Sequence, residues 1–160
     1  MRLTPWLLLL CAACAPPDEV DFVEEAVIPP PCEDRVTGND HRLDIPDATG
    51  RAVESSAWLS GAGTVSHVLV SVDLQHPYRG DLRVELIAPS GRAVVLKQPN
   101  VTDAADDVIY RDLDIQALAG EPAGGTWKLR IRDVRTGDAG ALRSWSIRLP
   151  CLPDDIPTTP

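Results

Sequence analysis

Three histidines, His41, His67 and His76, are the candidates for a catalytic general base in this chain. Hydrolysis of a peptide by the serine mechanism needs such a base, a nucleophile beside it and an acid that orients it. None of the histidines stands in the His-Gly-Thr setting of a serine peptidase, and no serine stands in a Gly-Thr-Ser setting. These observations predict that the chain is not an enzyme.

Calcium is the cofactor that the sequence could hold. It binds about six to eight oxygen atoms from carboxylates and backbone carbonyls, and an acidic loop can curl to supply them. The candidate ligands form the densest acidic stretch of the expected domain: Asp103, Asp106, Asp107, Asp112 and Asp114. A solvated acidic loop is the alternative, because no EF-hand loop or nonapeptide repeat occurs.

A basic stripe is the candidate for docking a partner. Lys128, Arg130 and Arg132 alternate with apolar residues, so they share the outer face of an expected strand. Arg148 is expected close by, on the partner of that strand. The stripe could dock an acidic protein surface. A solvated face that protects the sheet edge gives the same pattern, so both interpretations stand.

The elements that would position these side chains are strands. Apolar residues occupy every second position in three segments, 68–74, 82–88 and 127–131. Turn residues separate the strands, and no sustained helical stripe occurs. Residues 32–151 are therefore predicted to form an all-β, jelly-roll-like antiparallel β-sandwich. Trp127 and Trp145 are expected in its core.

The tripeptide Arg79-Gly80-Asp81 could be taken for an integrin-type motif. A structural role is the interpretation that we favour. Gly80 would supply a backbone angle that other residues resist, and Asp81 would accept hydrogen bonds from its own turn. Arg79 would pair with an acid such as Asp133. His76 is likewise expected to end a strand rather than to act as a base.

Several motifs follow one another along the chain, and they contain His76, Tyr78, Gly80, Asp81, Trp127, Asp133 and Trp145. The order of these motifs resembles the P/Homo B domain. This family is the β-sandwich module found beside the subtilisin-like catalytic domain of proprotein convertases and many bacterial secreted proteases. The resemblance extends from about Asn39 to Leu149.

The resemblance implies a non-catalytic module that stabilises and helps to fold a protease domain. For this chain it implies protein binding or stabilisation in trans, with a subtilisin-like protease or another envelope protein as the partner. A calcium-dependent adhesion or glycan-binding module is the alternative, and Trp58 and Tyr110 are its candidate sugar-stacking residues. A protease inhibitor or chaperone is a third hypothesis, which would need an exposed rigid loop.

Residues 1–13 have the layout of a secretory signal peptide, because Arg2 precedes an apolar run that is too short to span a bilayer. The string from Leu10 to Cys14 also resembles a bacterial lipobox, which implies that Cys14 carries lipid and anchors the protein to a membrane. Ordinary signal cleavage nearby is the alternative. Ala15 is not the aspartate of an inner-membrane retention signal, which favours an exported, outer-membrane lipoprotein.

Cys32 and Cys151 remain as an even pair once Cys11 leaves with the signal and Cys14 takes lipid. In an oxidising compartment such a pair predicts a disulfide, which would clasp the first and last strands. Closing so long a loop would stabilise the fold by about 4 kcal/mol.

The net charge of −9 belongs largely to the two ends of the chain. Residues 14–31 contain five acids and five prolines and are expected to form an extended tether, and the tail 152–160 is similar. Residues 33–151 carry 17 acidic and 14 basic side chains. The expected domain therefore lacks the basic excess that nucleic-acid binding requires.

Overall fold

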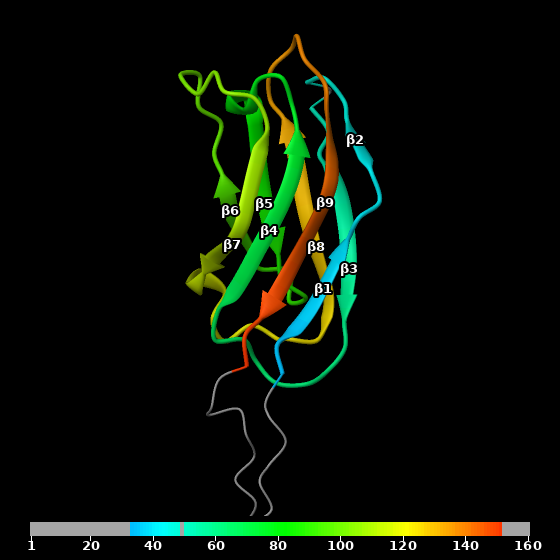
Figure 1. The fold of residues 1–160 in the computed structure, drawn as a ribbon, viewed down its shortest axis with the longest axis vertical. Helices are drawn as coiled ribbons and strands as arrows, with labels where there is room; N and C mark the ends of the chain where they lie inside the picture. The colour runs from blue at the N-terminus through cyan, green and yellow to red at the C-terminus, as the bar shows by residue number, and fades with distance from the viewer. Residues whose placement is uncertain (1–32, 49, 152–160) are drawn as a thin grey trace, which may run out of the picture. The chain divides into compact units, whose positions relative to one another are not determined.

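Two antiparallel sheets pack face to face in the computed structural model, which describes residues 33–48 and 50–151 (Figure 1). Sheet A contains β1 (Arg35–Asn39), β2 (Leu43–Ile45), β4 (Val68–Gln75), β7 (Val108–Ile115) and β9 (Gly140–Leu149). Sheet B contains β3 (Val53–Leu59), β5 (Leu82–Ile87), β6 (Ala93–Lys97) and β8 (Gly125–Asp133). The predicted all-β sandwich of jelly-roll type is confirmed.

Neighbouring strands follow the order β1-β9-β4-β7 in sheet A, where β2 also pairs with β9, and β3-β8-β5-β6 in sheet B. Two single-turn 3-10 helices, Arg79–Asp81 and Gln116–Leu118, lie between strands. No helix within the described ranges has the length and apolar character needed to cross a membrane.

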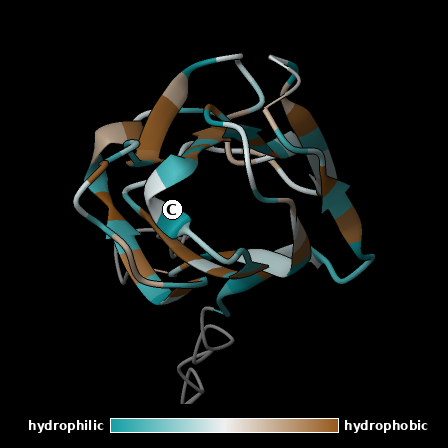
Figure 2. Ribbon diagram, turned by 90° about the horizontal axis from the view of Figure 1, so that it is seen from above, coloured by the Kyte–Doolittle hydropathy of each residue, from teal (hydrophilic) through white to brown (hydrophobic). Residues whose placement is uncertain are grey.

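The predicted strand periodicity is confirmed, and it decides which side chains form the core. Hydrophobic and hydrophilic residues alternate along the strands when the sandwich is seen from above (Figure 2). Removing the inward-facing residues from water is the main force that holds the sheets together. These residues are at most 1% exposed: Val68, Val70, Val72 and Leu74 in β4, Leu82, Val84 and Leu86 in β5, and Trp127, Leu129 and Ile131 in β8.

Trp127 and Trp145 lie in the core as predicted, with 0% and 2% of their surface exposed. Each buried indole N–H has an acceptor, as its burial requires. Trp127 Nε1 donates to the carbonyl of Ala123 at 3.0 Å. Trp145 Nε1 donates to Oγ of Ser55 at 2.8 Å, and this bond crosses from sheet A to sheet B.

A β-bulge in β9 explains a break in the alternation. The register between β4 and β9 skips Arg143, because Leu142 and Ser144 pair with consecutive residues of β4. An extra residue on one strand shifts which side chains face inward. Leu142 and Trp145, three positions apart, are therefore both buried.

Four connections gather at one end of the sandwich, which we call the turn end (Figure 1). Their described residues are 46–48 with 50–52, 76–81, 98–107 and 134–139. The start of β1 and the end of β9 lie at the opposite end (Figure 1). The motif segment that starts at His76 is therefore held away from both of these positions.

The prediction that Arg148 lies beside the Trp127 strand is wrong. Arg148 belongs to β9, in the other sheet. Its guanidinium lies 2.9 Å from a carboxylate oxygen of Asp34 and 3.0 Å from one of Asp112. The error arose because consecutive strands β8 and β9 belong to different layers instead of pairing.

Several predictions concern residues outside the described ranges. They are the signal peptide 1–13, the lipidated Cys14, the tether 14–31, Cys32 and the tail 152–160. The pairing of Cys32 with Cys151 therefore stays a prediction.

Candidate functional site

His76 is fully buried where β4 ends, and both of its ring nitrogens have partners. Nε2 lies 3.3 Å from Oδ2 of Asp133, the last residue of β8, whose side chain is also inaccessible. Nδ1 lies 2.9 Å from the carbonyl oxygen of Tyr78 and 3.2 Å from its backbone nitrogen. The direction of these bonds depends on the tautomer: Nδ1 can donate to the Tyr78 carbonyl or accept from the Tyr78 N–H, and Nε2 can donate to Asp133. His76 therefore ties the β4–β5 turn to β8.

The same pair joins two further connections at the turn end. The backbone N–H of Arg135 donates to Oδ1 of Asp133 at 3.0 Å. The backbone N–H of His76 donates to Oδ1 of Asp107 at 2.9 Å, and the N–H of Asp107 donates back to the His76 carbonyl. Three connections are thus held by one buried cluster, as expected where buried polar groups must all find partners.

Gly80 is required for a different reason from the one predicted. Its φ is not among the positive values found in the described chain. A Cβ at this position would instead lie 2.6 Å from the carbonyl oxygen of Asp103 and would also collide with the carbonyl oxygen of Asn100. Because both atoms belong to the backbone, neither can move aside cheaply. The absence of a side chain at Gly80 lets the 98–107 loop pack directly on the turn.

Arg79 pairs with Asp103 and not with Asp133, which corrects the prediction. Arg79 Nε donates to Oδ1 of Asp103 at 2.8 Å, and Lys97 Nζ donates to Oδ2 at 3.1 Å. These two cations hold the pKa of Asp103 below its ordinary value. Asp133 is unavailable to Arg79 because it is buried against His76.

Asp81 is buried, and a residue from another connection approaches it. Its Oδ1 has no hydrogen-bond partner in the described structure and lies 3.4 Å from Nε of Arg135, in the β8–β9 connection. The predicted acceptance of hydrogen bonds from its own turn is therefore not observed at this oxygen. Burial of Gly80 and Asp81 favours the structural role of the Arg-Gly-Asp segment over an integrin-type one.

The five candidate calcium ligands do not converge on one point. Within the described residues, no group of three or more His, Cys, Asp or Glu side chains is placed to hold a metal ion. Asp112 contacts Arg148, and Asp114 lies 3.0 Å from His67. Asp103 and Asp107 have the partners given above, and Asp106 is exposed. Calcium binding stays a prediction.

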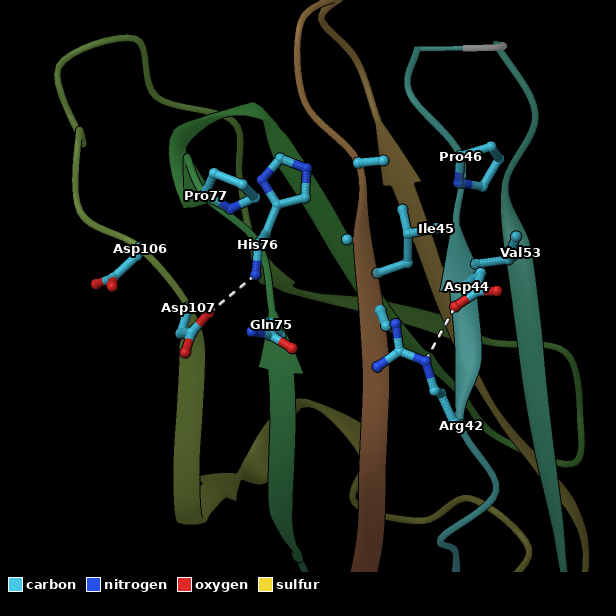
Figure 3. Close-up of a pocket in the computed structure, with 13 residues that line it drawn as sticks. Arg42, Asp44, Ile45, Pro46, Val53, Gln75, His76, Pro77, Asp106 and Asp107 are labelled. Atoms are coloured by element: carbon cyan, nitrogen blue, oxygen red, sulfur yellow. Dashed lines mark hydrogen bonds and ion pairs between the residues drawn. The ribbon is translucent and has the colours of Figure 1, made fainter.

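A pocket of ≈ 800 Å³ opens at the turn end. Asp106 and Asp107 lie on one side of it and the Arg42–Asp44 ion pair on the other, with the end of β4 between them (Figure 3). Among the described residues that line the pocket, His76 is the sole histidine, and no serine, threonine or cysteine is present. The pocket therefore offers carboxylates, an imidazole and other hydrogen-bonding groups, and no hydroxyl or thiol nucleophile is among its described lining residues.

The basic stripe lies on the outer face of sheet B, and most of it is neutralised. Arg130 Nε donates to Oε1 of Glu54 at 2.8 Å, and Lys128 Nζ lies 3.4 Å from Oε2 of the same carboxylate. Arg130 holds the pKa of Glu54 below its ordinary value. Arg132 is exposed, and no hydrogen bond or ion pair of its side chain is found within the described ranges. The three residues are therefore not equivalent.

Of the two candidate sugar-stacking residues, only Trp58 presents its ring to solvent, with 68% of its surface exposed. Tyr110 packs against the core, and its hydroxyl donates to the carbonyl of Leu96 at 3.4 Å. Burial raises the pKa of that hydroxyl.

The chain matches the family model of the proprotein convertase P-domain over residues 65–149, a little more than half of its length. It belongs to the P-domain family. The resemblance inferred from the motifs is confirmed, although the matched region begins at Val65 and not near Asn39. The P domain is a non-catalytic accessory domain of proteases.

Curated relatives of this P domain are proteases. It is 38% identical over 111 residues to a transglutaminase-activating metalloprotease of Streptomyces mobaraensis, a match that covers 68% of this chain and 14% of the relative. It is 37% identical over 95 residues to human proprotein convertase subtilisin/kexin type 7, covering 57% of this chain and 12% of the relative. The chain thus spans a small part of these relatives.

Among solved structures, the serine protease of Aeromonas sobria in complex with its chaperone shares the fold, with a TM-score of 0.63 and 22% identity. The match covers 75% of this chain and 27% of the other. The relatives described here are thus proteases by name, one of them a metalloprotease, and the solved structure shares the fold.

Sequence reasoning missed several residues that hold the site together. Arg135 and Glu54 are charged residues far along the chain from their partners, Asp81 and Arg130. Lys97 and Arg83 are charged residues that pair with nearby acids, Asp103 and Glu85. Asp107 was assigned to calcium, whereas it binds the His76 backbone. Only the knowledge of which strands and connections are neighbours could have identified the contacts of Arg135, Glu54 and Asp107, whereas Arg83 and Glu85 share one face of a strand by their spacing alone.

Proposed function

We propose that this protein is an exported, lipid-anchored P domain without catalytic activity, which binds and stabilises a subtilisin-like protease or another envelope protein in trans. Cys14 would carry the lipid, and residues 14–31 would connect it to the domain. The outer membrane is the favoured address.

The observation that carries the proposal is the internal use of the motif residues. His76, Asp81 and Asp133, the groups with acid or base chemistry in the motif, are at most 6% exposed and serve to hold three connections in place. A catalytic base must reach a substrate proton. A buried cluster that fixes surface loops in advance is instead suited to presenting a rigid binding surface.

The experiment is a pull-down from the native envelope with the full-length, Cys14-anchored protein as bait. The eluate is labelled with a fluorophosphonate, which marks active serine hydrolases. Enrichment of a labelled subtilisin-like protease over a bait-free control is the expected result. Recovery of no protein partner would contradict the proposal. A Cys14→Ala bait is the control for anchoring, and it should leave the membrane fraction.

A glycan-binding module is the second candidate, and the exposed ring of Trp58 favours it. Sugar rings stack on such aromatic faces. Recovery of polysaccharide without protein in the same pull-down would support this function. Retention of the polysaccharide by a Trp58→Ala bait would count against it.

A further inference from the structure

We propose that the outer face of sheet B is the surface that docks the protein partner, and that the partner presents an acidic patch to Arg132 and Arg83 beside an apolar contact for Trp58. This inference rests on the proposed function, since it identifies the surface and the chemistry of the binding described there.

Two arginines stand directly opposite each other on this face. Arg83 of β5 pairs in register with Arg132 of β8, and both side chains point away from the core, between buried neighbours. Like charges at directly opposed positions of an antiparallel pair destabilise it. A retained repulsion of this kind is relieved when an anion lies between or above the two guanidinium groups.

Only one of the two arginines is satisfied by this protein's own acids. Arg83 contacts Oε1 of Glu85 through Nε and Nη2, at 3.1 and 2.8 Å, and donates from Nη1 to Gln98 at 2.8 Å. Arg132 is exposed and finds no acid within the part of the chain described here. Its five N–H donors therefore remain available to a carboxylate.

The other charges of the face are already matched. Glu54 binds Arg130 and Lys128, and Glu85 lies between Arg83 and Arg130. Four basic side chains and two acidic ones thus lie on β3, β8 and β5 of this face, which leaves a positive excess at the Arg132 end. Charge complementarity then requires an acidic partner surface.

Trp58 supplies the apolar part of the same surface. It lies on β3, opposite Thr126 of β8, and points to the same side as Arg132. Thr126 and Arg132 are six residues apart on one strand, so the two ends of the patch are about 20 Å apart. A protein patch of about 800 Å² is wide enough to reach both. Trp and Arg are the residue types that contribute most to binding at such interfaces.

Addition of a partner strand at the nearby edge is disfavoured, so side chains must make the contact. Thr37 Oγ1 donates to the carbonyl of Trp58 at 2.8 Å, and Asn39 Nδ2 donates to that of Ser56 at 3.1 Å. These bonds from β1 occupy carbonyls along the edge of β3. A partner would therefore lie on the face of sheet B.

The test places a photo-reactive benzoylphenylalanine in place of Thr126, which is exposed beside Trp58, in the full-length protein in its native envelope. The same group in place of Ile109, which is 55% exposed on sheet A, is the control. After irradiation, cross-linked peptides are identified by mass spectrometry. We expect adducts to peptides of a protein partner from the first position and few or none from the second.

Charge reversal makes the test specific to Arg132. Arg132→Glu should lower the adduct yield by about fivefold or more, because attraction becomes repulsion. Arg143→Glu makes the same charge change at a half-exposed residue of sheet A and should leave the yield within about twofold. Circular dichroism melts establish that both variants are folded.

The outcomes separate the two proposals. A protein partner recovered with equal adduct yields from wild type and Arg132→Glu would overturn this surface and leave the proposed function intact. The absence of any protein adduct or pull-down partner would remove both. Adducts solely to glycan, to lipid or to residues 18–25 of the chain itself would contradict an acidic protein partner.

Discussion

Two contacts between a nitrogen donor and a carboxylate, His76–Asp133 and Arg130–Glu54, lie in opposite surroundings in this P domain. The first has no exposed side-chain surface, and the second has 38% and 34% exposed. The first holds together the connections at the turn end, whereas the second lies on an open sheet face. Removal of one member leaves a group buried without a partner in the first case and a solvated one in the second.

The comparison indicates that the buried motif residues, by which the family is recognised, hold the connections of the turn end together. Exposed residues outside the motif are the ones accessible to a partner. Burial makes each member of the His76 cluster depend on the others. The exposed side chains on the outer face of sheet B contribute little to the free energy of unfolding, but they are accessible to a partner.

Asp133→Ala should lower the free energy of unfolding by about 3–5 kcal/mol, because it strips both His76 and the Arg135 N–H of a buried acceptor. Urea unfolding followed by tryptophan fluorescence measures the change. Asp133→Asn, which retains an acceptor oxygen, is the matched control and should cost less. A loss below about 1 kcal/mol for the alanine variant would show that the cluster is not the framework.

Gly80→Ala should lower the free energy of unfolding by about 1–3 kcal/mol, through overpacking against the 98–107 loop. Gly63→Ala is the comparison, because no atom lies within 4 Å of a Cβ at that position. Since φ of Gly63 is +90°, any loss of stability in that variant comes from backbone conformation and not from a steric clash. Hydrogen exchange should speed up in residues 98–107 for Gly80→Ala only. Equal exchange in both variants would argue against the close packing.

Arg130→Ala should change the free energy of unfolding by less than about 1 kcal/mol, because its ion pairs are exposed to solvent. The small loss should shrink further in about 1 M salt, which screens such pairs. Thermal melts at low and high salt provide the measurement. A loss as large as that of Asp133→Ala would erase the distinction between the two regions.

The pH dependence of the Glu54 contribution has a definite sign. Arg130 holds the pKa of Glu54 below its ordinary value of 4.5, so the unfolded chain takes up the proton first. The contribution is therefore present above pH 4.5 and is lost as the pH falls below that value. Wild type and Glu54→Gln should differ slightly in unfolding free energy at pH 7 and converge near pH 3. A difference in unfolding free energy between the two proteins that grows as the pH falls would contradict a lowered pKa of Glu54.

The sequence was sufficient for the sandwich, because alternation and turn residues are local signals. The alternation of apolar and polar residues alone predicted the buried strands that contain Val68, Leu82 and Trp127. Partners were harder to infer. Arg79 was assigned to Asp133 and Arg148 to the wrong sheet, since each assignment needed the strand order, which periodicity does not contain.

The role of Gly80 shows the same limit. Sequence indicates that a glycine is needed in a turn, but the cause here is a loop that arrives from 20 residues further along the chain. The division of Lys128, Arg130 and Arg132 into matched and free cations likewise depends on Glu54, which only sheet pairing brings near.

Peptide hydrolysis by the purified protein tests the central claim most directly. A fluorogenic peptide library is incubated with the wild type and with Arg132→Glu, with and without calcium and a fluorophosphonate. The account predicts the rate of the buffer alone in every case. Turnover that purifies with the chain, and is lost when one of its own histidines or serines is replaced in a variant that still folds, would contradict it.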